Sequence, residues 1–127
     1  MVELNIKKER IKMPVVVDIN NCEKYMWEDN CFGWHLLKKE ELSVISEEVP
    51  AGKSEKRHFH KEGRQFFYIL NGKATMELEG IDYELLSGQG IGIEPGQKHK
   101  FKNTSGFMVT FIVVTAPKKA EDRVDIE

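Results

Sequence analysis

The chain has 127 residues and a mass of 14.7 kDa, which fits one domain and leaves little room for a second. Apolar residues make up 40% and charged residues 31% of the sequence, and no apolar run approaches the roughly 20 residues of a membrane-spanning helix. Nineteen Lys and Arg against 21 Asp and Glu give a net charge of −2. This balance argues against nucleic acid or an anionic membrane as a partner, since both require a concentrated positive field.

The segment from Met1 to Lys12 is charged throughout and lacks the apolar stretch of a signal peptide. The chain has two cysteines, Cys22 and Cys31. We therefore expect a cytoplasmic protein whose thiols are free.

Short β-prone runs follow one another along the chain, separated by turn signals rich in Gly, Pro and Asn. The runs expected to form strands are residues 15–17, 32–37, 42–49, 65–70, 73–79, 83–86, 90–93, 98–102 and 107–114. Asn71-Gly72, between two such runs, predicts a two-residue hairpin turn. A helix is expected only near residues 20–29 or in the last ten residues. Many short strands predict an all-β sandwich or barrel.

The last ten residues, 118–127, are strongly charged. We interpret this segment as a flexible, solvated tail. The alternative is a strand or clasp that lies on a partner subunit.

Two of the four histidines, His58 and His60, are separated by one residue. In a strand, residues two apart point to the same face, so both imidazoles can reach one point. Such a pair alone is weak evidence for a metal site, and a second element must supply another ligand. His99 is a candidate because it follows Pro95-Gly96, a rigid turn that fixes where the next strand starts. The remaining histidine, His35, is interpreted as a surface or packed residue.

Two segments together resemble the motifs of the cupin superfamily. Residues 52–72 have the spacing G-x5-H-x-H-x4-Q-x6-G, and residues 88–103 have the spacing G-x5-E-P-G-x2-H-x3-N. The 15 residues between them are typical of small single-domain cupins of the cupin 2 type, often grouped with mannose-6-phosphate isomerases. The resemblance implies one cupin domain over residues 1–127, folded as a double-stranded β-helix, or jelly-roll barrel, with a metal inside its mouth.

By this resemblance the metal ligands are His58, His60, His99 and Gln65. Gln65 stands where the family usually has Glu, so its neutral amide oxygen would replace a carboxylate. A divalent transition metal is expected, with Zn, Fe, Ni, Cu and Mn all left open. Three alternatives remain: Gln65 stays out of the ligand shell, Glu62 supplies a carboxylate, or the pocket has lost its metal and keeps the histidines for hydrogen bonding.

Glu94, where the family usually has Pro, and Tyr68 are the candidate catalytic residues. Counting in steps of two from Gln65, Phe67 and Ile69 are expected to line the barrel interior. Cationic side chains gathered between Lys53 and Arg64 could recruit an anion to the mouth. The resemblance to small cupins favours a metal-dependent oxygenase, isomerase or epimerase that acts on a small polar molecule. The alternative is a non-catalytic module that binds such a molecule.

A homodimer is expected because small jelly rolls have edge strands that must be covered. Residues 2–6 or 15–19 would meet that edge.

Overall fold

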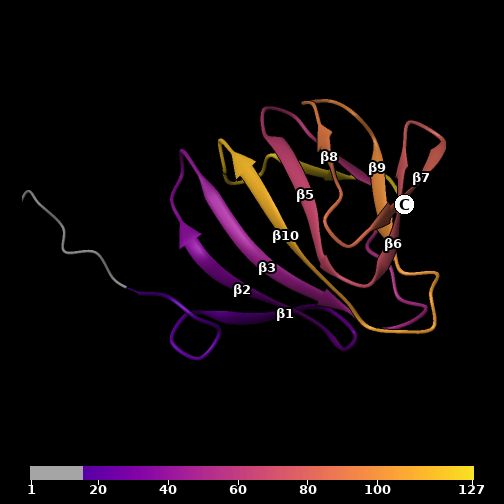
Figure 1. Cartoon of the computed structure of the whole chain (residues 1–127). Helices are drawn as coiled ribbons and strands as arrows, with labels where there is room; N and C mark the ends of the chain where they lie inside the picture. The colour runs from indigo at the N-terminus through magenta and orange to yellow at the C-terminus, as the bar shows by residue number, and fades with distance from the viewer. Residues whose placement is uncertain (1–15) are drawn as a thin grey trace, which may run out of the picture.

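The computed structural model describes residues 16–127, which form eleven β-strands and no helix. The strands lie in two antiparallel sheets, one in the order β1-β2-β3-β10-β5-β8 and one in the order β11-β4-β9-β6-β7 (Figure 1). This is the jelly roll predicted from the sequence. Their bounds are β1 Lys24–Glu28, β2 Cys31–Lys38, β3 Ser43–Val49, β4 His58–His60, β5 Arg64–Asn71, β6 Lys73–Leu78, β7 Ile81–Leu86, β8 Gly90–Ile93, β9 His99–Lys102, β10 Val109–Ala116 and β11 Arg123–Asp125.

The hydrophobic core lies between the two sheets. Strands β5 and β10 alternate strictly between buried and more exposed residues, which is the pattern of a sheet with one face on the core. The rings of Phe67, Phe101 and Phe111 stack on one another, with centroids 4.1 to 6.0 Å apart. Phe67 and Ile69 point inward as predicted, and Ile69 is fully buried. Phe66 and Tyr68, between them, point outward.

Eight of the nine predicted strands are confirmed within a few residues at each end. The ninth, residues 15–17, begins at a residue outside the described part of the chain, and Val16 and Val17 are not in a strand. Residues 2–6, expected at a sheet edge, also lie outside the described residues. Cys22 and Cys31 are both free, as expected.

The predicted hairpin at Asn71-Gly72 is wrong. Strand β5 pairs with β8 and β10, whereas β6 pairs with β7 and β9, so the chain passes from one sheet to the other at Gly72. Gly72 has a φ of 102°, and a Cβ there would lie 2.9 Å from the carbonyl oxygen of Met108. Glycine is therefore required for a close backbone approach at a corner. The two-residue hairpin occurs instead at Glu79-Gly80, between β6 and β7, where both residues have positive φ.

The helix that was expected near residues 20–29 is replaced by strand β1, which pairs with β2. Along β1, Tyr25 and Trp27 are half-buried and their neighbours are exposed. This alternation of aromatic residues is a strand pattern, and it is only five residues long.

The C-terminal segment contains a strand of this chain's own barrel, which corrects the expectation of a solvated tail. Strand β11 pairs with β4, so that Arg123 lies opposite His60 and Asp125 opposite His58. Asp122, just before β11, is buried. Strand β11 therefore pairs with the first motif of the same chain. The sequence does not predict this strand, because the burial of charged residues such as Asp122 depends on tertiary contacts.

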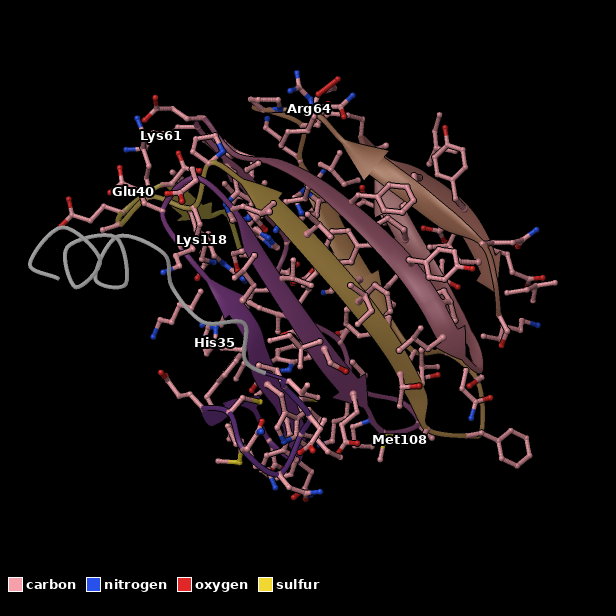
Figure 2. All side chains as sticks on the ribbon, turned by 60° about the vertical axis from the view of Figure 1, so that its left-hand side comes forward. His35, Glu40, Lys61, Arg64, Met108 and Lys118 are labelled. Carbon is pink, nitrogen blue, oxygen red and sulfur yellow. The ribbon has the colours of Figure 1, made fainter. Side chains whose placement is uncertain are left out.

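One end of the large sheet carries Arg64, Lys61 and Lys118, and Met108 lies at the opposite end (Figure 2). The described residues contain no helix long and apolar enough to cross a membrane.

Candidate metal centre and cavity

Three histidines converge inside the barrel. His58 and His60 are the first and last residues of β4 and point to the same face, and His99 begins β9 directly opposite His58. All three are buried, with exposed fractions of 1%, 6% and 0%. Each ring offers one nitrogen atom such that the three nitrogens all lie within 4.8 Å of one another, so the three residues could hold a metal ion. The structure thus brings together the three histidines named from the sequence.

The outer nitrogens of two of these rings are held by backbone acceptors. Nδ1 of His58 lies 2.8 Å from the carbonyl oxygen of Lys56, and Nδ1 of His99 lies 2.9 Å from that of Gln97. A carbonyl only accepts, so each Nδ1 carries the proton and each Nε2 presents its lone pair. Nε2 of His60 is buried without a hydrogen-bond partner among the described residues. Fixing the outer nitrogen in this way is how proteins orient histidine ligands.

Burial keeps these imidazoles neutral. Removal from water disfavours the charged form, which lowers the pKa of His58 to about 3 and that of His60 to about 4. The pKa of His99 is also lowered, chiefly by burial. All three rings are therefore unprotonated at neutral pH, which is the form that binds a metal.

Gln65 faces the same centre. Its amide nitrogen donates to Oγ1 of Thr115 at 3.0 Å, and this contact turns its oxygen toward Nε2 of His99, 3.1 Å away. Because Nδ1 of His99 holds the proton, the oxygen of Gln65 and Nε2 of His99 are two acceptors facing each other. A cation beside both atoms would relieve this repulsion. Three neutral imidazoles and an amide oxygen therefore fit a divalent transition metal.

The candidate centre opens on a cavity of about 240 Å³ between the two sheets. Its apolar wall includes Phe67, Ile45 and Val113, and its polar lining comes from both sheets and from the C-terminal segment. Lys118, at one end of the sheet in Figure 2, is exposed and lines the cavity from its rim. A small cavity with a mixed lining suits one small polar molecule.

Two carboxylates in the cavity were not identified from the sequence. Glu47 accepts a hydrogen bond from the phenol of Tyr25 at 2.9 Å, and burial raises its pKa to about 7. Glu55 accepts from the backbone amide of Phe101 at 2.8 Å, and burial raises its pKa to about 8. The inward direction of Glu47 was predictable from the sequence, because Glu47 lies two residues from each of the inward-facing Ile45 and Val49.

The two catalytic candidates from the sequence do not line this cavity. Tyr68 is on the outward face of β5 and is 39% exposed. Glu94 is exposed and forms an ion pair with Arg64, which lies at one end of the sheet in Figure 2. Neither side chain is placed to reach a ligand at the histidines.

The other charged residues considered from the sequence are also placed elsewhere. Glu62 lies beyond the end of β4 and pairs with Lys119 at 3.2 Å, so it does not supply a carboxylate to the histidines. Within the cationic run, Arg57 pairs with Glu77 and Lys53 with Asp29. The cations that line the cavity are instead Lys118 and Arg123. His35, interpreted as a surface or packed residue, also lines the cavity.

The family model of the cupin domain matches residues 45–115, more than half of the chain. The chain therefore belongs to the cupin family. Among curated proteins it is 30% identical over 73 residues to the polyketide synthase CurC of Streptomyces cyaneus, a match that covers 55% of this chain and 47% of CurC. The chain thus spans about half the length of that relative.

Solved structures show the same fold. The polyketide cyclase RemF of Streptomyces resistomycificus superposes with a TM-score of 0.76 and 22% identity, covering 91% of this chain and 87% of RemF. A sugar phosphate isomerase of the cupin superfamily from Silicibacter pomeroyi superposes with a TM-score of 0.72 and 18% identity, covering 80% of this chain and 75% of the isomerase. At these identities the likeness concerns the fold alone.

Proposed function

We propose that this cupin is a metal-dependent enzyme that isomerises a small hydroxy-carbonyl molecule, in the manner of a sugar isomerase or epimerase. The observation that carries the proposal is one cavity that is lined both by two histidines of the candidate metal centre, His58 and His60, and by two carboxylates of raised pKa, Glu47 and Glu55. Isomerisation next to a carbonyl requires a polarised oxygen and a nearby base. The sugar phosphate isomerase among the structural neighbours supports this choice.

The bound ion would polarise the carbonyl oxygen of the substrate and so make the adjacent C–H bond more acidic. His58, His60, His99 and Gln65 would hold it. The apolar wall at Phe67 would exclude water from one side of the substrate. A carboxylate of the cavity would take the proton. Carboxylates with a pKa near neutral suit the abstraction of a proton from carbon, which is the central step of an isomerase, and this favours an isomerase over an oxygenase.

Deuterium exchange tests the proposal with simple hydroxy-carbonyl probes. The metal-loaded protein is incubated in D₂O with glyceraldehyde, dihydroxyacetone, glyceraldehyde 3-phosphate and hexose phosphates, and loss of carbon-bound protons is followed by NMR. We expect exchange with at least one probe, and none with His58→Ala. Binding of a probe without exchange would instead indicate the non-catalytic binding module.

We propose further that the chain forms a homodimer through the outward face of β5. Phe66, Tyr68 and Leu70 are 46%, 39% and 49% exposed there. Beside them lies a hollow of about 310 Å³, which is lined in part by Phe66, Gly92 and Val114. Projecting aromatic rings next to a hollow on one face suit an isologous contact between two copies.

A cytoplasmic location remains our proposal. The two free cysteines support it, because Cys31 is fully buried and no disulfide links it to Cys22.

A further inference from the structure

Three neighbouring strands of the large sheet each place one residue at the same point of the cavity. Tyr25 on β1 lies opposite Gly33 on β2, and Gly33 lies opposite Glu47 on β3. The ring of Tyr25 crosses over Gly33, and its hydroxyl reaches Oε2 of Glu47 at 2.9 Å. A Cβ at position 33 would lie 2.4 Å from Cζ of Tyr25. The contact between Tyr25 and Glu47 therefore depends on glycine between them.

This pair shares the cavity with the histidine centre. Tyr25 and Glu47 come from the large sheet, whereas His58 and His60 come from the small sheet, and all four line the same space. A ligand held at the histidines would thus have the Tyr25–Glu47 pair on the other wall of the barrel.

Glu47 has no ion-pair partner within 4.0 Å among residues 16–127. A half-buried carboxylate that lines a cavity without such a partner costs folding free energy, which makes Glu47 a candidate for a functional role. Burial raises its pKa to about 7, and the hydrogen bond from Tyr25 opposes that rise. Besides the histidine ligands, the titratable or charged residues that line the cavity with Glu47 are Tyr25, His35, Glu55, Lys118 and Arg123.

Glu55 is less free to react. One of its oxygens accepts from the amide of Phe101, and the other lies 3.8 Å from Nδ1 of His58 and 3.9 Å from Nη1 of Arg123. These contacts engage both oxygens in holding the elements that carry the histidines. Glu47 has a single hydrogen bond from a side chain, and its second oxygen has no partner in the described residues.

We propose that Glu47 is the general base of the reaction and that Tyr25 is a positioning residue, which Gly33 allows to reach it. The assignment rests on the proposed function. In the reaction, Glu47 takes the proton from the hydroxyl-bearing carbon next to the carbonyl, the C–H electron pair forms the C=C bond of an enediolate, and the carbonyl oxygen takes up the displaced electron pair. The proton of the substrate's hydroxyl group then passes to that oxygen, and the hydroxyl oxygen becomes the new carbonyl oxygen. The C=C electron pair takes the proton back from Glu47 at the former carbonyl carbon. No oxidant or reductant is consumed.

The orientation of Tyr25 is supported on its second side. The ring of His35 lies 4.8 Å from the ring of Tyr25, centroid to centroid. The phenol is thus held between Gly33 below and His35 beside it. Its own pKa is raised by burial and by Glu47, so the hydroxyl keeps its proton and donates it to the carboxylate.

The test compares Glu47→Gln, Tyr25→Phe and Gly33→Ala with the control Glu48→Gln, on the opposite face of β3. The readouts are metal content and the pH dependence of deuterium exchange with the probes that wild-type protein accepts. Glu47→Gln is expected to lose at least about 100-fold in exchange rate while keeping its metal, since that is what a general base contributes. Glu48→Gln is expected to behave as wild type.

Tyr25→Phe and Gly33→Ala test the positioning role through the pH dependence of the exchange rate, which a purely structural role would leave unchanged. Both remove the hydrogen bond that lowers the pKa of Glu47, so the rise of the exchange rate with pH should shift to higher pH in both variants. If Glu47→Gln exchanges deuterium as fast as the wild type, the base assignment is overturned and the proposed function still stands. An unshifted pH profile in both Tyr25→Phe and Gly33→Ala overturns the role of Tyr25. Wild-type protein that exchanges no probe overturns the proposed function and the assignment together.

Discussion

Nδ1 of His60 lies 3.6 Å from Oδ2 of Asp122, a residue of the C-terminal segment. The same carboxylate accepts hydrogen bonds from the backbone amides of Glu62 and Gly63, at 2.7 and 2.9 Å. These bonds lower the pKa of Asp122 and keep it ionised, although burial opposes them. The C-terminal segment thus holds the turn after β4 and places a negative charge beside one candidate ligand.

Asp122→Asn should therefore weaken metal binding, even though Asp122 is not itself a candidate ligand. Loss of the negative charge near His60 is expected to cost about 10- to 100-fold in metal affinity, the usual cost of losing such a supporting contact. Asp125→Asn, a change to an exposed carboxylate three residues along, is the matched control. Equal affinities of the two variants in a metal titration would contradict a supporting role for Asp122.

Gln65→Glu should tighten metal binding. The carboxylate would lie beside His99 and add a negative charge in contact with the ion, an attraction on the order of 4 kcal/mol at an effective dielectric of about 20. The observed gain should be smaller, because the carboxylate must be desolvated. Without metal the same variant should melt at a lower temperature than wild type. A lower melting temperature together with unchanged metal affinity would show that Gln65 is not a ligand.

The metal-free protein should be most stable between about pH 4.5 and 6.5, a window set by the ordinary pKa values of Glu and His. Below it, the unfolded chain binds protons that the buried His58 and His60 cannot, because their folded pKa values are about 3 and about 4. Stability then falls as the pH falls.

Above the window the sign reverses. Glu47 and Glu55 hold protons in the folded state up to about pH 7 and about pH 8, whereas the unfolded chain has already lost them. Stability therefore declines as the pH rises toward 8. Melting temperatures of chelator-treated protein across this range give the curve, and Glu47→Gln should flatten its alkaline side. A melting temperature that keeps rising from pH 6.5 to 8 would be the opposite of this expectation.

Phe66→Glu should shift the protein toward a monomer, because it places a charge in the proposed dimer contact. Phe107→Glu changes an exposed aromatic residue in the loop before β10 and should leave the assembly unchanged. Light scattering of the wild type should give about twice the chain mass of 14.7 kDa. A mass of about 15 kDa for the wild type at micromolar concentration would rule out the dimer.

The parts of the site that were predictable from the sequence are those with fixed spacing. His58 and His60 share a strand, and the turn at Pro95-Gly96 places His99, so the spacing of the two cupin-like motifs was enough to predict that all three lie together. Phe67 and Ile69 followed from the two-residue period of β5. Most strands were also found, because alternation and turn residues are local features.

The parts that were missed depend on contacts between distant segments. Tyr25 belongs to a strand that was interpreted as a possible helix, and Asp122 to a segment that was interpreted as a solvated tail. Glu94 and Tyr68 were chosen for their closeness to the motifs along the chain, yet they lie on the outside of the barrel. Asn71-Gly72 has the composition of a hairpin turn, and only the pairing of β5 and β6 with other strands shows that it is a corner.

Metal analysis of protein purified without a metal-binding tag is the most direct test of the central claim, that His58, His60 and His99 hold a divalent transition metal. We expect about one such ion per chain in the wild type and in His35→Ala, whose ring lines the cavity outside the three-histidine centre. We expect almost none in His58→Ala, whose melting temperature should no longer rise when metal is added. Wild-type protein that carries no metal after incubation with excess ion, and that melts with added metal as His58→Ala does, would contradict the claim.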